Sequence, residues 1–212
     1  MRAFVLIALT AGAIACASKP SEEGVAPSPA ITRPLERMTG QQIVVFPVQY
    51  LSVADTLGWQ SQLGDRSAFL SRLDDEIESV LTARGLGHTW TFGRAVSRAA
   101  QLNNILGVNA HQLGAEWLRG RVLPDQTVRD PLATQVRQLV GLKGSRYALL
   151  PVELRLQSNG GTGVAILRVV MIDSRLAQIR WVGEVSSDPM RAFSPALATS
   201  VATHFADLIV AP

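Results

Sequence analysis

The chain has 212 residues, of which 47% are hydrophobic and 17% are charged. This composition excludes an intrinsically disordered protein, and the length is sufficient for one domain with its own hydrophobic core. The formal net charge is only +3, and no dense run of Lys and Arg occurs. We therefore expect no nucleic-acid partner, although the sequence pI is near 9.6.

The first 15 residues have the pattern of a secretory signal peptide. Met1 and Arg2 supply a short positive region, and the apolar run AFVLIALTAGAI that follows is shorter than the ~20 residues of a transmembrane helix. Small residues then precede Cys16. The segment Ala13-Ile14-Ala15-Cys16 resembles the bacterial lipobox, with Ala13 where Leu is most common. This resemblance implies that the chain is cut before Cys16 and that the Cys16 thiol is lipidated.

Cys16 is the only cysteine of the chain, so an intramolecular disulfide is excluded. The alternative to lipidation is that the ordinary signal peptidase cuts after Ala15 or Ala17. We expect lipidation, which places the protein on a membrane facing the periplasm. Ala17 stands where enteric bacteria use Asp to retain lipoproteins at the inner membrane, and this favours the outer membrane.

Residues 16–40 are predicted to form the lipidated cysteine and a flexible tether. This segment consists mainly of Ser, Pro, Glu, Gly and Ala, with almost no large apolar residue before Ile31. Such a sequence buries too little surface to offset the entropy lost on ordering. The folded domain is expected to cover residues 41–212.

The first half of this domain is predicted to contain two strands and two helices. Residues 43–48 are a continuous apolar, largely β-branched run, which is typical of a strand that is covered on both faces. Residues 51–64 are expected to form a loop. Asp65 or Ser67 is expected to cap a helix that ends at Gly85 or Gly87 and has one apolar face. A short strand is predicted at 88–92 and a helix at 94–105.

The second half is predicted to contain a helix, three strands and a final helix. The segment 107–131 has no clear pattern, and a helix is expected at 132–142. Short turns separate three strand-like runs, which predicts an antiparallel meander; these runs cover residues 147–156, 164–172 and 178–185. An amphipathic helix is expected at 194–209. The fold class is therefore mixed α/β: one domain with a mixed sheet and helices packed on it.

Four short motifs resemble those of a group of envelope proteins. This group contains the curli-secretion channel lipoprotein, the lipoprotein activators of penicillin-binding proteins and the N-terminal domain of the Tol-system propeller protein. The motifs are Val44-Val45-Phe46-Pro47, Ala83-Arg84-Gly85-Leu86, Gly144-Ser145-Arg146-Tyr147 and the segment from Asp173 to Trp181. The resemblance covers roughly residues 41–210, although the Thr-Gly of the last motif is missing. It implies an α/β domain that works by contact, and it offers no catalytic residues to carry over to this chain.

Catalytic and metal sites have little support in the sequence. His88, His111 and His204 lie in different predicted elements without metal-ligand spacing, so neither a metal nor a cofactor is expected. No Gly-x-Ser-x-Gly motif occurs. A polar pocket that joins a histidine, an acid and a serine would nevertheless favour a hydrolase. Trp59 and Trp117 lie in loop-like segments, and one of them is expected to mark an exposed contact patch.

The main hypothesis is a membrane-anchored lipoprotein that acts as a non-catalytic interaction or assembly module in the cell envelope. Its partners are then membrane lipid, through Cys16, and an envelope protein. The alternative is an exported hydrolase with an unrecognised site. A pore-forming subunit would need additional membrane-spanning hairpins, and residues 107–131, with several charges and two prolines, do not supply them.

Overall fold

The computed structural model describes residues 32–54, 58–159 and 161–212. The signal peptide, Cys16 and residues 17–31 of the expected tether lie outside the described residues. Among the described residues, no helix has the length and hydropathy that crossing a membrane requires.

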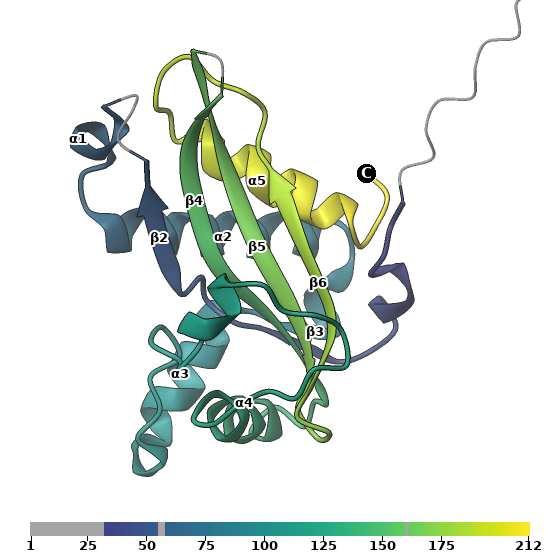
Figure 1. Cartoon of the computed structure of the whole chain (residues 1–212). Helices are drawn as coiled ribbons and strands as arrows, with labels where there is room; N and C mark the ends of the chain where they lie inside the picture. The colour runs from purple at the N-terminus through teal and green to yellow at the C-terminus, as the bar shows by residue number, and fades with distance from the viewer. Residues whose placement is uncertain (1–31, 55–57, 160) are drawn as a thin grey trace, which may run out of the picture. The chain divides into compact units, whose positions relative to one another are not determined.

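A six-stranded mixed sheet lies at the centre of the domain (Figure 1). Its order is β3-β1-β4-β5-β6, and β2 also pairs with β4. The last three strands form the predicted antiparallel meander. The strands are β1 (Ile43–Val45), β2 (Tyr50–Val53), β3 (Trp90–Thr91), β4 (Tyr147–Asn159), β5 (Thr162–Asp173) and β6 (Gln178–Ser186).

The strand expected at 43–48 ends at Val45, and a second strand, β2, follows after a break; the two strands pair with β4 one after the other. β1 lies parallel to the first residues of β4, and β2 lies parallel to Glu153–Leu156. Pro47 stands between the two strands and has no N–H to donate to a ladder. The expected loop at 51–64 is therefore wrong, because it contains most of β2 and the short helix α1 (Trp59–Leu63).

Helices cover both faces of the sheet. The helices α2 (Arg66–Ala83) and α5 (Ala196–Asp207) lie side by side behind the sheet in Figure 1. The helices α3 (Gly93–Leu102) and α4 (Leu132–Gly141) pack on the opposite face, at the lower end of the view. The mixed α/β class and the expected helices are thus confirmed, with ends that differ by a few residues.

A bulge in β4 exchanges the two faces of that strand. The register between β4 and β5 shifts between Pro151 and Glu153, and one extra residue reverses the alternation of side chains beyond it. Before the bulge, Leu150 packs against the α3–α4 layer; beyond it, Leu154 packs against α2 and α5. The bulge turns Glu153 toward the 3-10 turn Glu116–Arg119, where Arg119 pairs with it.

The folded domain begins earlier than Gln41. Leu35 is only 1% exposed and packs in the core against the α2–α5 layer. Its N–H donates to the carbonyl of Leu208, just beyond α5, at 3.1 Å. The compact unit begins at Thr32, so residues 32–40, which were expected in the tether, pack with the domain.

Candidate functional site

Helix α3 carries the features that stand out from the rest of the surface. A polar pocket lies between α3 and α2, and a more apolar groove lies between α3 and α4. The α3 side chains that face the core are small, and they include Val96 and Ala100. The helix therefore lies close to the sheet while its polar and larger side chains point outward.

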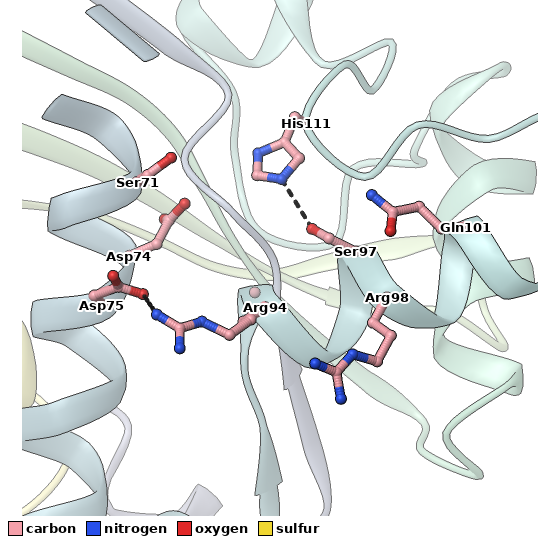
Figure 2. Close-up of a pocket in the computed structure, with 9 residues that line it drawn as sticks. Ser71, Asp74, Asp75, Arg94, Ser97, Arg98, Gln101 and His111 are labelled. Carbon is pink, nitrogen blue, oxygen red and sulfur yellow. Dashed lines mark hydrogen bonds and ion pairs between the residues drawn. The ribbon is translucent and has the colours of Figure 1, made fainter. Parts of the chain in front are cut away.

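The α2–α3 pocket has a volume of about 330 Å³. In Figure 2, Ser71 and Asp74 project from α2, Ser97 projects from α3, and the loop above contributes the imidazole of His111. The lining residues are Ser71, Asp74, Asp75, Gly93, Arg94, Ser97, Arg98, Gln101 and His111.

Ser97 and His111 form a hydroxyl–imidazole pair. Ser97 Oγ lies 2.9 Å from Nε2 of His111, and burial lowers the pKa of His111. A neutral imidazole beside a hydroxyl is the arrangement of a general base and a nucleophile. No sequence pattern indicates this pair, because the two residues are 14 positions apart in different elements.

Asp74 is the acid of this pocket. One of its carboxylate oxygens accepts a hydrogen bond of 2.9 Å from the N–H of Val48. Burial raises the pKa of Asp74 to about 7, and the nearby charge of Asp75 acts in the same direction. The sequence suggests only a solvated acidic face at Asp74-Asp75-Glu76. The fold instead turns Asp74 toward the break between β1 and β2, where it binds a backbone amide that the sheet leaves free.

The pocket falls short of a catalytic triad. In the part of the chain that the structure describes, no carboxylate is hydrogen-bonded to the second ring nitrogen of His111. Asp75 is instead paired with Arg94 at 2.5 Å. Ser97 lies inside α3, where the surrounding amides bond within the helix and do not converge on a reacting oxyanion. The geometry therefore supplies a nucleophile and a base without the groups that orient the base and stabilise the transition state.

The α3–α4 groove has a volume of about 500 Å³ and lies on the other side of α3. Two large apolar side chains of the lining are exposed, Leu102 at 79% and Leu142 at 41%, and Ile105, in the 3-10 turn after α3, is 92% exposed. Soluble domains rarely gather large apolar side chains outside the core without a contact to make. The groove is lined by Glu78, Arg94, Ala95, Arg98, Ala99, Leu102, Asn103, Leu142 and Lys143.

The two tryptophans expected at a contact surface differ in their environment. Trp59 is 2% exposed, and its ring packs edge-on against Phe193 at 5.9 Å between centroids. A buried indole offers no contact surface, so that expectation is corrected for Trp59. Trp117 is partly exposed and stacks with the guanidinium of Arg129 beside a separate hollow. A contact role for Trp117 stays a prediction.

The three histidines are not brought together. His88 is exposed in the 3-10 turn Leu86–His88, whereas His204 lies in α5 and bonds to the carbonyl of Ser186. Within the described ranges, no cluster of three or more His, Cys, Asp or Glu side chains has a geometry that suits a metal ion.

Comparisons with known proteins found similar solved structures but no matching family profile or curated protein. One similar structure is LpoB from E. coli, with 15% identity, a TM-score of 0.42, and coverage of 90% of this chain and 84% of LpoB. Another is the PelC dodecamer from Paraburkholderia phytofirmans, with 10% identity and a TM-score of 0.42; the match covers 82% of this chain and 91% of PelC.

A third similar structure is a lipoprotein from Neisseria meningitidis, with 17% identity and a TM-score of 0.32. The match covers 68% of this chain and 77% of the Neisseria chain. Two of these structures, LpoB and the Neisseria lipoprotein, are envelope proteins of the kind that the motifs resemble. At this level of identity, the similarity concerns the fold alone.

Proposed function

We propose that this protein is a lipid-anchored envelope lipoprotein that works by contact with another envelope protein and performs no chemistry of its own. The observation that carries the contact function is the exposure of Leu102, the last residue of α3, and of Ile105 in the 3-10 turn that follows it. Burying two such side chains on a partner contributes roughly 1.5–3 kcal/mol each. Large apolar side chains that are exposed in the isolated domain lower its solubility. Their exposure is therefore consistent with a surface that a partner covers in the complex.

The anchor is supported by the sequence that precedes the domain. Cys16 follows a signal-peptide-like segment, and about 15 residues, mostly Ser, Pro, Glu, Gly and Ala, separate it from the first described residue. A flexible chain of that length spans on the order of 20 Å. This distance holds the domain close to a membrane, where a high effective concentration favours contact with membrane-bound machinery. With Ala17 after the cysteine, we assign the anchor to the outer membrane.

The first experiment tests the anchor. We expect mass spectrometry of the mature N-terminus to find a lipid-modified Cys16, and fractionation to recover the protein with outer membranes. Cys16→Ser should yield an unprocessed or soluble protein. An unmodified N-terminus in the natural protein would disprove the anchor.

The second experiment tests contact. Crosslinking in intact cells should recover a specific envelope protein with the anchored form, and much less of it with the Cys16→Ser form, because the effective concentration is lost. Equal recovery from both forms, or recovery of no protein from either, would contradict the proposal.

An exported hydrolase is the second candidate, and the α2–α3 pocket is the observation that favours it. Its polar lining joins Ser97, His111 and Asp74. The discriminating test is turnover by the purified protein on a panel of ester, peptide and glycan substrates, with Ser97→Ala and His111→Ala as variants. Turnover that either variant abolishes would replace the contact function by a catalytic one. We expect none above background.

A further inference from the structure

The side chains that line the α3–α4 groove suit the binding of a helix. Ala95, Ala99 and Leu102 follow one another at positions i, i+4 and i+7 of α3, so they form one stripe along the helix. Leu142, just after α4, lies across from this stripe. The two alanines let a neighbouring backbone approach closely, while the two leucines form walls, which is the arrangement that packs ridges into grooves.

The rim of the groove is positively charged. In the described part of the chain, Arg98 and Lys143 form no ion pair, whereas Arg94 is bound to Asp75 on the other side of α3. Glu78 is the single acid of the lining and lies near Arg94. Two unpaired cations beside an apolar floor attract a partner surface that carries carboxylates beside apolar side chains.

The walls of the groove favour a helix over an extended strand as the occupant. Both α3 and α4 satisfy their backbone groups within the helix, so neither offers the free N–H and C=O groups that an added strand requires. Recognition then depends on side chains that enter a hollow. An amphipathic helix presents such side chains at i, i+3, i+4 and i+7.

The position of the groove favours a protein over the membrane of the anchor. The chain enters the domain at Leu35, which packs with α5 on one face of the sheet. The groove lies in the helical layer on the opposite face, and in Figure 1 the end of α3 is far from the point where the coloured chain begins. A concave groove also matches a protruding helix better than a flat lipid surface.

We infer that the α3–α4 groove binds an acidic amphipathic helix of an envelope partner protein, with the partner's apolar side chains on Ala95, Ala99, Leu102 and Leu142 and its carboxylates beside Arg98 and Lys143. This inference rests on the proposed contact function and assigns the surface that performs it.

The test is site-specific photo-crosslinking of the full anchored chain in cells. A photoreactive p-benzoylphenylalanine replaces Leu102, and a matched chain carries it in place of Leu176, which is 55% exposed in the β5–β6 turn. The crosslinked segment is identified by mass spectrometry. We expect the Leu102 position to yield a product with a segment that is rich in Asp and Glu and has apolar residues at helical spacing.

Charge reversal tests the rim. Arg98→Glu combined with Lys143→Glu should reduce the yield of that product by roughly tenfold or more. The control combines Arg175→Glu with Arg191→Glu, two exposed arginines without an ion pair in the described ranges, and should leave the yield within about twofold. Thermal melting of each variant verifies that the domain is folded.

Four results would overturn the inference: no product at Leu102, a product with phospholipid, a product with a second copy of this chain, or a yield that charge reversal leaves unchanged. If the Leu176 position captures an envelope protein while Leu102 does not, the assignment of the groove as the binding surface is wrong, but the contact function stands. If neither position captures a protein and the purified chain turns over a substrate, both the groove assignment and the contact function are wrong.

Discussion

The guanidinium of Arg146 donates two hydrogen bonds, of 2.8 and 2.5 Å, to one oxygen of the Asp173 carboxylate. Asp173 is 1% exposed, and its other oxygen accepts from the N–H groups of Arg175 and Leu176. The residues next to these strands add a further link, because the hydroxyl and the N–H of Ser174, just after β5, both donate to the carbonyl of Arg146, just before β4. Two of the motifs that carry the resemblance thus meet in one structural contact that closes the meander.

A second motif contact has the same character. Arg84, at the end of α2, donates to the carboxylate of Asp207 at 2.8 Å and to the carbonyl of Val210 at 2.9 Å. Gly85 follows with φ +91°, a conformation that stops the helix and that glycine adopts without strain. These motif residues join elements of the fold, which accounts for their presence without any catalytic role.

Removing the Arg146 guanidinium should destabilise the domain. Arg146→Met leaves the Asp173 carboxylate buried with only its backbone donors, and we expect a loss of about 2–3 kcal/mol in the free energy of unfolding. The neighbouring Arg175→Met, on an exposed side chain, should cost less than about 0.5 kcal/mol. Urea denaturation of both variants measures the difference, and equal losses would show that the ion pair adds nothing.

This contribution should depend on pH in the acid range. Burial by itself raises the pKa of Asp173, but the hydrogen bonds from Arg146 and from the two backbone amides outweigh it and hold the pKa below its ordinary value. A lowered pKa in the folded state contributes stability above the unfolded value of about 4. That stability is lost as the pH falls through the lowered value. The difference between Arg146→Met and the natural protein should therefore shrink below about pH 4.

Asp74 should have the opposite effect on stability. Because burial raises its pKa to about 7, the folded state holds a proton that the unfolded state has lost between about pH 4 and pH 7. Stability from this group therefore falls as the pH rises through that range and is constant above it. Asp74→Asn keeps an oxygen for the Val48 amide and removes the charge.

We expect Asp74→Asn to gain roughly 1–3 kcal/mol relative to the natural protein on going from pH 5 to pH 8. Urea denaturation at the two pH values gives this difference directly. Asp75→Asn, on the exposed neighbour, controls for the loss of one negative charge from α2. Parallel pH profiles for the natural protein and Asp74→Asn would refute the prediction.

The same substitution in two helices should separate the core from the proposed contact surface. Leu73 is fully buried in α2, whereas Leu102 is 79% exposed at the end of α3. Leu73→Asp places an unpaired carboxylate in the core and should cost about 3–5 kcal/mol. Leu102→Asp should change the free energy of unfolding by less than about 0.5 kcal/mol. Chemical denaturation of both variants measures these changes. A large decrease in the free energy of unfolding of Leu102→Asp would mean that Leu102 stabilises the fold.

Gly163 should not tolerate a side chain. A Cβ atom at this position would lie 2.0 Å from the ring of Trp59, and the buried indole has little space to move. Gly163→Ala should therefore destabilise the domain by about 1–3 kcal/mol. Gly141, at the end of α4, has open space around its Cβ position, and Gly141→Ala should be neutral or stabilise by up to ~1 kcal/mol. Thermal melting of the two variants makes the comparison, and similar melting temperatures would contradict the tight contact.

Much of the fold could be predicted because its elements have strong local signals. In α2, Phe69, Leu73, Ile77 and Leu81 are all buried on one face, as the helical spacing requires. Asp65 caps this helix through the N–H of Ser67 at 2.8 Å. The meander follows equally from three apolar runs separated by turns. Local spacing is sufficient in these cases because every residue of the pattern contributes to the same buried face.

Other features depended on contacts that no local pattern contains. The alternation in β6 suggests that Ile179 and Trp181 share a face, but a register shift opposite Met171 and Ile172 places them in different layers. Trp181 packs over Gly183 toward α2 and α5, whereas Ile179 faces α3 and α4. A bulge reverses the pattern at a position that only the pairing of two strands defines.

The sequence by itself determined the single cysteine, the order of the main helices and of the meander strands, and the mixed α/β class, because each of these depends on neighbouring residues. The tertiary structure alone decided which side chains meet across long separations: Ser97 with His111, Arg146 with Asp173, and Leu102 with Leu142 at one groove. It also decided that Trp59 is buried and Leu102 exposed. The exposure of a side chain depends on which other segments pack on it. Hydrophobicity alone does not distinguish a buried Trp59 from an exposed Leu102 before the chain folds.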